Sequence, residues 1–307
     1  MSMKIKFWGV RGSIPCPGAQ TMKYGGNTAC IELRFPEINR LIIIDAGSGI
    51  RELGNFIMAN DFRRGPINTD IFLTHTHWDH IMGFPFFTPI YVPGSVIRIH
   101  GPVSFEGDTL AKIVGDQLTY RYFPVRQEEL AARIDYFDLK EGALDLGDGI
   151  TVTAKYLNHP ILCLGYRFAW QGKTICTAYD TEPFRNVFCT DLADPSYDEG
   201  MATEGQLVAE EQNAVLEHFF AGADLLVHDA QYTQEEYQAR FIGWGHSSFE
   251  HTVAAARRTG VKSLALFHHD PMRTDAQIDA LTEKYCVSVG QEDPEVFFAR
   301  EGLERAI

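Results

Sequence analysis

Apolar, strand-like runs that end in acidic or imidazole side chains are the feature that most restricts the fold of this chain. Asp45 follows "LIII", Asp180 follows "TICTAY", Asp229 ends "LLVHD", and His268 follows "LALF". The runs are rich in β-branched and aromatic residues and are bounded by turn signals, which is typical of strands. Because rigid strand ends are where layered α/β proteins assemble their sites, we expect these side chains to converge on one site.

Between the strand-like runs, apolar residues return every three or four positions, which indicates helices. Ser247 followed by Glu250 has the pattern of a capping box at the start of one of them. Helices are expected over residues 48–60, 208–220, 247–259 and 275–285.

The densest group of polar side chains lies in "IFLTHTHWDH", residues 71–80. On an extended segment His75 and His77 point to the same side, so both imidazoles can reach one metal ion. Asp79 and His80 lie past the expected strand end, where a turn can direct them to a second ion. The other interpretation is a set of satisfied core or surface histidines. It is the weaker one, because this cluster is costly to bury without a cation.

Composition excludes several classes of protein. The 307 residues carry a net charge of −14 without a block of like charge, so a long polyanion gains little from the surface. The sequence has neither a signal-peptide pattern nor an apolar run of membrane-spanning length, so we expect a cytoplasmic protein without a membrane partner. The six scattered cysteines form no C-x-x-C motif, which favours reduced thiols.

The chain has no internal repeat, low-complexity linker or break in composition. We therefore expect a single domain over residues 1–307. Residues 182–205 form the least regular stretch and are rich in acidic side chains, so they are expected to be a long surface insertion.

The run "THTHWDH" resembles the signature of the metallo-β-lactamase superfamily. The resemblance implies an α/β fold, the αββα sandwich, with a dinuclear metal site along one edge of the sheets. Asp45 in "DAGSG" then resembles a structural aspartate beneath the site, and His159 in "LNHP" a third histidine of the first metal. Asp180 resembles the bridging carboxylate and His268 the last ligand, with the adjacent His269 as the competing choice. The implied metal ligands are His75, His77, Asp79, His80, His159, Asp180 and His268.

Further stretches, including "GYRFAWQGKTICTAYDTEP" and "GWGHSSFEHTVAAARRTGVKSLALFHHDP", are similar to the phosphodiesterase branch that contains ribonuclease Z and cyclic-nucleotide phosphodiesterases. In that branch a histidine of a G-H-S loop assists the leaving group and an acid supports it. The matching residues are His246 and Asp229. Asp229 is one methylene shorter than the usual glutamate, so its contact with His246 is left open. The candidate catalytic residues are Asp79, His246 and Asp229.

From these residues we expect a metal-dependent hydrolase that cleaves a small phosphodiester, such as a cyclic nucleotide, through a hydroxide bridging two divalent ions. Zinc is the preferred metal, with manganese or iron as alternatives. Acidic side chains just after Asp180 make long nucleic acid a less favoured partner, and a homodimer is allowed. The alternatives are a ribonuclease Z-like RNA-processing nuclease, a lactone, thioester or β-lactam hydrolase of the same fold, and a non-catalytic metal-loaded sensor.

Overall fold

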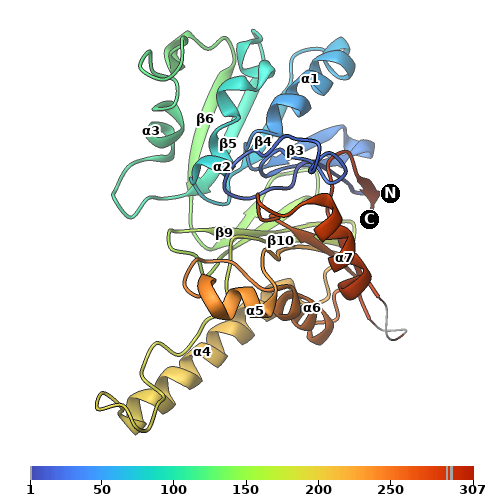
Figure 1. Cartoon of the computed structure of the whole chain (residues 1–307). Helices are drawn as coiled ribbons and strands as arrows, with labels where there is room; N and C mark the ends of the chain where they lie inside the picture. Colours follow the sequence, from blue (N-terminus) through green and yellow to red (C-terminus); the bar gives the residue numbers. More distant parts are fainter. Residues whose placement is uncertain (1, 288–289, 291–292) are drawn as a thin grey trace.

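Two seven-stranded sheets form the centre of the molecule (Figure 1). The computed structural model describes residues 2–287, 290 and 293–307. The first sheet has the order β14-β1-β2-β3-β4-β5-β6 and is made of β1 (Lys4–Gly9), β2 (Cys30–Phe35), β3 (Arg40–Ile44), β4 (Asn68–Phe72), β5 (Val96–Pro102), β6 (Arg133–Leu139) and β14 (Glu304–Ala306). The second has the order β13-β12-β11-β10-β9-β8-β7 and is made of β7 (Gly142–Asp145), β8 (Thr151–Tyr156), β9 (Leu164–Trp170), β10 (Lys173–Ala178), β11 (Leu225–Asp229), β12 (Ser263–Phe267) and β13 (Glu295–Phe298).

Each sheet combines a parallel half with an antiparallel half. The neighbours from β3 to β6 and from β10 to β13 are parallel, and the remaining neighbours are antiparallel. Parallel strands are covered on both faces, which is why β3 and β11 are almost continuously buried. Because β3, β4, β10, β11 and β12 lie in these parallel segments, their carboxyl ends open on the same edge of each sheet.

Helices cover the outer faces of the sheets (Figure 1). α1 and α3 pack on the first sheet, and α4, α6 and α7 pack on the second. The helices are α1 (Ile50–Asn60), α2 (Trp78–Ile81), α3 (Leu110–Gly115), α4 (Glu199–Phe220), α5 (Gln234–Glu236), α6 (Phe249–Arg258) and α7 (Asp275–Tyr285). Single turns of 3-10 helix lie at Pro36–Ile38, Phe62–Arg64, Phe84–Phe86, Thr88–Tyr91 and Gln127–Glu129, and a π-helical turn lies at Tyr237–Phe241.

Three apolar clusters hold these layers together. The central one joins the facing sheets, where Phe72 of β4 packs edge-on against Phe168 of β9 with ring centroids 5.4 Å apart. A second cluster joins the second sheet to α4, α6 and α7, and a third joins the first sheet to α1 and α3. Each fully buried side chain of this size contributes about 1.5–3 kcal/mol. The order helix, sheet, sheet, helix confirms the expected αββα sandwich.

Three helices begin at positions that differ from those expected, and the first of them, α1, begins at Ile50 and not at residue 48. Ser248, and not Ser247, caps α6, because its hydroxyl accepts from His251 N while the Ser247 hydroxyl donates to Thr181 O. The capping box expected from Ser247 and Glu250 is therefore wrong. α4 begins at Glu199, nine residues before the expected 208, because the Asp198 side chain caps it by accepting from Met201 N.

α4 extends away from the body of the molecule and carries an irregular loop at its far end (Figure 1). The expected insertion over residues 182–205 therefore contains the first turns of this helix. Its first residue, Glu182, is buried, whereas Asp191, Asp194 and Asp198 are exposed. Within the described residues, no helix is both long enough and apolar enough for a membrane crossing.

Candidate metal centre

The ends of four parallel strands deliver the expected residues to one place. Asp45 follows β3, the histidine-rich segment follows β4, Asp180 follows β10, and His268 follows β12. Asp45, Asp180 and His268 all have φ near +60°, at 60°, 59° and 62°. This left-handed conformation is unfavourable for a residue with a Cβ, by roughly 1–2 kcal/mol. Its repetition at three strand ends means that surrounding contacts hold a strained backbone, which is typical of functional sites.

The histidine-rich segment is not part of a strand, contrary to the expectation from the sequence. β4 ends at Phe72, so His75 and His77 lie in the loop that follows, and Asp79 and His80 lie in the short helix α2. The chain leaves the sheet because Asp45 captures Thr74, whose backbone N and hydroxyl donate to its carboxylate at 2.7 and 2.9 Å.

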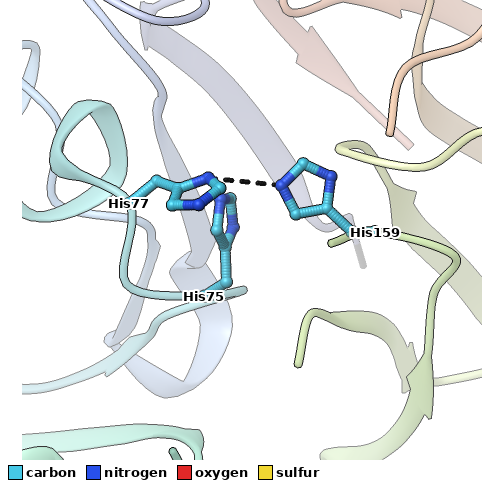
Figure 2. A group of neighbouring side chains, drawn as sticks. All are labelled: His75, His77 and His159. Carbon is cyan, nitrogen blue, oxygen red and sulfur yellow. Dashed lines mark hydrogen bonds between the residues drawn. The ribbon is translucent and has the colours of Figure 1, made fainter. Parts of the chain in front are cut away.

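His75, His77 and His159 form the first cluster (Figure 2). His159 Nε2 lies 3.2 Å from His77 Nδ1, and the rings of His75 and His159 have centroids 4.8 Å apart. His75 is fully buried, and its Nε2 has no hydrogen-bond partner within the part of the chain that the structure describes. Burial lowers the pKa of His75 well below its usual value and that of His159 to about 4. Both rings are therefore neutral at pH 7, the state in which imidazole binds a metal.

Asp79, His80, Asp180 and His268 form the second cluster, and all four are buried. His268 Nε2 lies 3.2 Å from Asp79 Oδ2 and 3.2 Å from Asp180 Oδ1. His80 Nε2 lies 3.3 Å from Asp79 Oδ2 and 3.4 Å from Asp180 Oδ2. Burial opposes charge on His80, but Asp180, Asp79 and Asp45 outweigh it and raise the pKa of His80 well above its usual value.

Asp180 lies between the two clusters. Besides its contacts in the second cluster, its Oδ2 is 3.6 Å from His75 Nε2 and 4.0 Å from His159 Nε2. Its Oδ1 is buried without a hydrogen-bond donor among the described residues. The site therefore combines two buried carboxylates with several imidazole nitrogens, and one atom of each type lacks a hydrogen-bond partner among the described residues. Divalent cations fit this arrangement, because a cation satisfies the carboxylates and the imidazole nitrogens at the same time. The mixed nitrogen and oxygen donors suit zinc, manganese or iron.

A second set of contacts fixes the orientation of His80. Its Nδ1 donates to Asp45 Oδ2 at 2.8 Å, which leaves Nε2 directed at Asp79 and Asp180. Asp45 is completely buried and also accepts from the Tyr179 hydroxyl at 2.8 Å. A carboxylate that holds the far nitrogen of a histidine is a common support for a metal ligand. This position agrees with the structural role expected for Asp45.

The segment Arg11–Ser13 supports the second cluster from a distant part of the chain. Ser13 N donates to Asp79 Oδ2 at 2.7 Å. A Cβ on Gly12 would lie 2.4 Å from His268 Cε1, so only glycine allows this approach. The Arg11 side chain is fully buried and donates to the backbone oxygens of Gly25, Asp270 and Arg273. The glycine in "VRGS" was the signal for a close approach, but its partner is distant in sequence.

His246 and Asp229 make the contact that the sequence left open. His246 Nδ1 lies 2.7 Å from Asp229 Oδ2, so the shorter carboxylate does reach the ring. The His246 ring stacks on His268 with centroids 5.1 Å apart and an angle of 21°. Burial would lower the pKa of His246, but Asp229 and, more weakly, Asp180 raise it to about 9. Without metal ions, the charged form of the His246 ring is therefore favoured beside the second cluster.

Glu182 holds the loop that carries His246, a role that the sequence analysis missed. Its carboxylate accepts from Gly243 N at 2.9 Å, from Gly245 N at 2.8 Å and from the Tyr237 hydroxyl at 3.3 Å. Gly245 O in turn accepts from His159 Nδ1 at 3.1 Å. Glu182 thus orients the loop that carries His246, which we call the acid loop, and through Gly245 also His159 of the first cluster. The sequence placed it in a surface insertion because residues 182–205 have no regular apolar pattern and are rich in acidic residues.

His269 does not face the clusters. Its Nε2 donates to Ala299 O at 2.8 Å, and burial lowers its pKa to about 3. Of the two adjacent histidines, His268 is the one that lies beside Asp79 and Asp180. The structure therefore brings together all seven expected ligands and the pair His246–Asp229 on one edge of the sandwich.

Comparisons with known proteins agree with this architecture. Residues 24–165 match the model of the metallo-beta-lactamase superfamily. The ribonuclease Z proteins of Lactococcus lactis subsp. lactis (strain IL1403) and Streptococcus suis (strain 98HAH33) are each 27% identical to this chain. The alignments span 87% of this chain and 88% of the first, and 91% of this chain and 93% of the second. The metallo-beta-lactamase fold protein YhfI from Bacillus subtilis superposes with a TM-score of 0.63 at 18% identity, over 99% of both chains. The chain thus has the metallo-beta-lactamase fold, and its residues 24–165 are similar to that superfamily.

Proposed function

We propose that this protein is a metal-dependent phosphodiesterase that hydrolyses a small phosphodiester such as a cyclic nucleotide. The observation that carries the proposal is the 2.7 Å contact between His246 and Asp229 beside the second cluster. Hydrolysis of an alkyl phosphodiester expels a poor leaving group, so a positioned proton donor has a large effect on it. Cleavage of a strained β-lactam or of a thioester has less need of such a donor.

The residues of the two clusters would hold two divalent ions, zinc in the first instance. His75, His77 and His159 would hold one, and Asp79, His80 and His268 the other, with Asp180 between them. Ions in these positions supply Lewis-acid charge that activates water and offsets negative charge on the phosphate.

Apart from binding the ions, the protein holds a proton on one nitrogen of His246. Because His246 Nδ1 is engaged by Asp229, Nε2 is the nitrogen that can donate to the departing oxygen. The pKa of about 9 keeps His246 protonated at pH 7, and nearby cations would lower that pKa toward the working pH, where a general acid is most effective. Asp229 orients the ring and stabilises its charged form, as acids do in other catalytic dyads.

The charge of the molecule favours a small substrate over a long one. The net charge is −14, although the exposed Asp191, Asp194 and Asp198 lie in the loop at the far end of α4, away from the two clusters. Binding of a nucleic-acid backbone depends on neutralising many phosphates, whereas a single diester depends mainly on the ions and their ligands. The competing candidate is an RNA-processing nuclease, and its support is the 27% identity to proteins named ribonuclease Z.

The test is a substrate panel measured on metal-free protein with zinc or manganese added back. We expect turnover of bis(p-nitrophenyl) phosphate and of 3′,5′-cyclic AMP, and none of a chromogenic cephalosporin or a lactone. Replacing His218, an exposed histidine on α4, by alanine should leave every rate unchanged and is the matched control for a histidine substitution. Faster cleavage of precursor tRNA than of all small diesters would favour the nuclease. Rapid hydrolysis of the cephalosporin alone would overturn the reaction class, and inertness toward every substrate would favour the sensor.

A further inference from the structure

A hollow of about 320 Å³ opens beside His159 of the first cluster. Its walls include His159 of the first cluster and Gly245, the residue before His246. The opposite walls come from the segment after β10, through Phe184, Arg185 and Val187. The volume is at the lower end of the range for small-molecule sites, about 300–1,000 Å³. It is sufficient for one heterocyclic group with its sugar.

The position of the hollow relates it to one side of the reaction. In the proposed function His246 protonates the departing oxygen, so the group bonded to that oxygen must lie next to His246. Gly245 precedes His246 and forms part of the wall, and the rings of His159 and His246 have centroids 5.6 Å apart. The hollow therefore receives the group that carries the departing oxygen.

The walls have the chemistry of a site for a planar group with hydrogen-bonding atoms. Phe184 and Val187 are apolar, and Val187 is 84% exposed, which is unusual for its type. Arg185 is the one cationic residue among the lining residues. Its Nε donates to Glu182 Oε1 at 3.2 Å, so the two terminal nitrogens of the guanidinium keep their donors for a ligand. A guanidinium fixed in this way stacks on nucleobases and bonds their acceptors.

These walls are held in place before any ligand binds. Glu182 N donates to Asn158 O at 3.0 Å, and Asn158 Nδ2 donates to Glu182 O at 3.0 Å. The Glu182 carboxylate holds Gly243 and Gly245 on one side and Arg185 on the other. A Cβ on Gly245 would lie 2.3 Å from His159 Nδ1, so the loop has no room to shift toward the cluster.

We propose that this hollow is the leaving-group subsite and that it binds the nucleoside part of the substrate, with Arg185 on the base. The inference rests on the proposed function, and it narrows the substrate class to phosphodiesters whose departing alcohol belongs to a nucleoside. A 3′,5′-cyclic nucleotide meets this condition, because its departing 3′ oxygen and its base belong to the same nucleoside.

The test compares two substrates with the same reacting centre. One is 3′,5′-cyclic AMP, and the other is the 3,5-cyclic phosphate of methyl riboside, which has no base. Arg185→Met keeps the length of the side chain and removes the planar cation. Since contacts to one base are worth about 1–3 kcal/mol, we expect KM for cyclic AMP to rise roughly 5- to 100-fold, with KM for the baseless substrate unchanged. Val187→Glu, at an exposed position, should also raise KM for cyclic AMP, because it places a charged side chain in the hollow. Arg133→Met, on the edge strand β6, is the matched control.

The outcomes separate this inference from the function on which it rests. Suppose that the wild type hydrolyses both substrates, and that Arg185→Met changes both KM values equally or changes neither. The proposed subsite is then wrong, while the proposed phosphodiesterase function is retained. If the wild type hydrolyses no diester, the proposed function is wrong, and the subsite is judged by equilibrium dialysis with adenosine. Weaker binding of adenosine to Arg185→Met than to the wild type would then support the subsite. Equal binding, or none to the wild type, would overturn it.

Discussion

Replacing Glu182 by glutamine tests how far the acid loop depends on one buried carboxylate. Glu182 is 4% exposed and accepts from Gly243 N, Gly245 N, Tyr237 and Arg185. The glutamine offers one oxygen in place of two, and its amide group would point N–H groups at backbone N–H groups. A hydrogen bond to a charged group contributes about 1.5–3 kcal/mol, so the loss of one or two should destabilise the protein by roughly 2–4 kcal/mol. For a domain of this size that corresponds to a fall in Tm of roughly 5–10 °C.

The same substitution should alter the reaction selectively. A loosened loop misplaces His246, and its effect reaches His159 because Gly245 O accepts from His159 Nδ1. We expect kcat on cyclic AMP to fall by at least tenfold more than kcat on bis(p-nitrophenyl) phosphate, whose leaving group needs no proton. Glu204→Gln, at an exposed position on α4, is the control and should change neither Tm nor kcat. A Glu182→Gln protein with the Tm and the substrate preference of this control would refute the role of the carboxylate.

Three further predictions follow from the geometry and charges of the molecule. Metal analysis should find about one ion fewer per chain in His268→Ala, whereas His269→Ala should keep its metal content and only lose stability; the reverse result would exchange their roles. Asp70, buried against Arg98 and His100, has a pKa held well below its usual value, with burial opposing these partners. The ionised Asp70 therefore stabilises the fold above pH ~4, and this contribution decreases as the pH falls. Asp70→Asn should lower the free energy of unfolding by about 3–5 kcal/mol at pH 7 and by progressively less in acid. Urea titrations at several pH values measure this difference. In metal-free protein the pKa of His246 is raised to about 9, so its contribution to the free energy of unfolding is fully present below pH ~6.5 and is lost as the pH rises through 9. The difference in free energy of unfolding between the wild type and His246→Gln should therefore narrow between these pH values. A difference that stays constant would show that the pKa of His246 is not raised.

The sequence predicted those parts of the structure whose pattern is local and strong. α7 has the bounds expected for it, residues 275–285, because uninterrupted apolar periodicity defines both ends. β6 and β7 are at sheet edges and are half exposed, so their apolar alternation is too weak to identify them from the sequence. The first half of α4 was taken for a loop because Gly200 and Gly205 interrupt it, and the Asp198 cap is visible only in the structure.

The candidate site was predictable where chemistry is concentrated in short segments. "THTHWDH" brings four potential metal ligands together in a short segment. The resemblance to a known signature located the other expected ligands. Contacts that depend on distant segments could not be read in this way. Ser13 meets Asp79 across 66 positions of the chain, and Glu182 meets Gly245 across 63. These supports use ordinary residue types whose role appears only when the loops are folded together.

The most direct test of the central claim is the effect of His246→Ala on two diesters with different leaving groups. The account predicts that the variant keeps its metal content and loses about 10²–10⁴-fold in kcat on cyclic AMP, whose alkoxide needs a proton, while the loss on bis(p-nitrophenyl) phosphate is much smaller. Equal losses on both substrates would contradict it, because His246 would then bind the phosphate instead of delivering a proton to the departing oxygen.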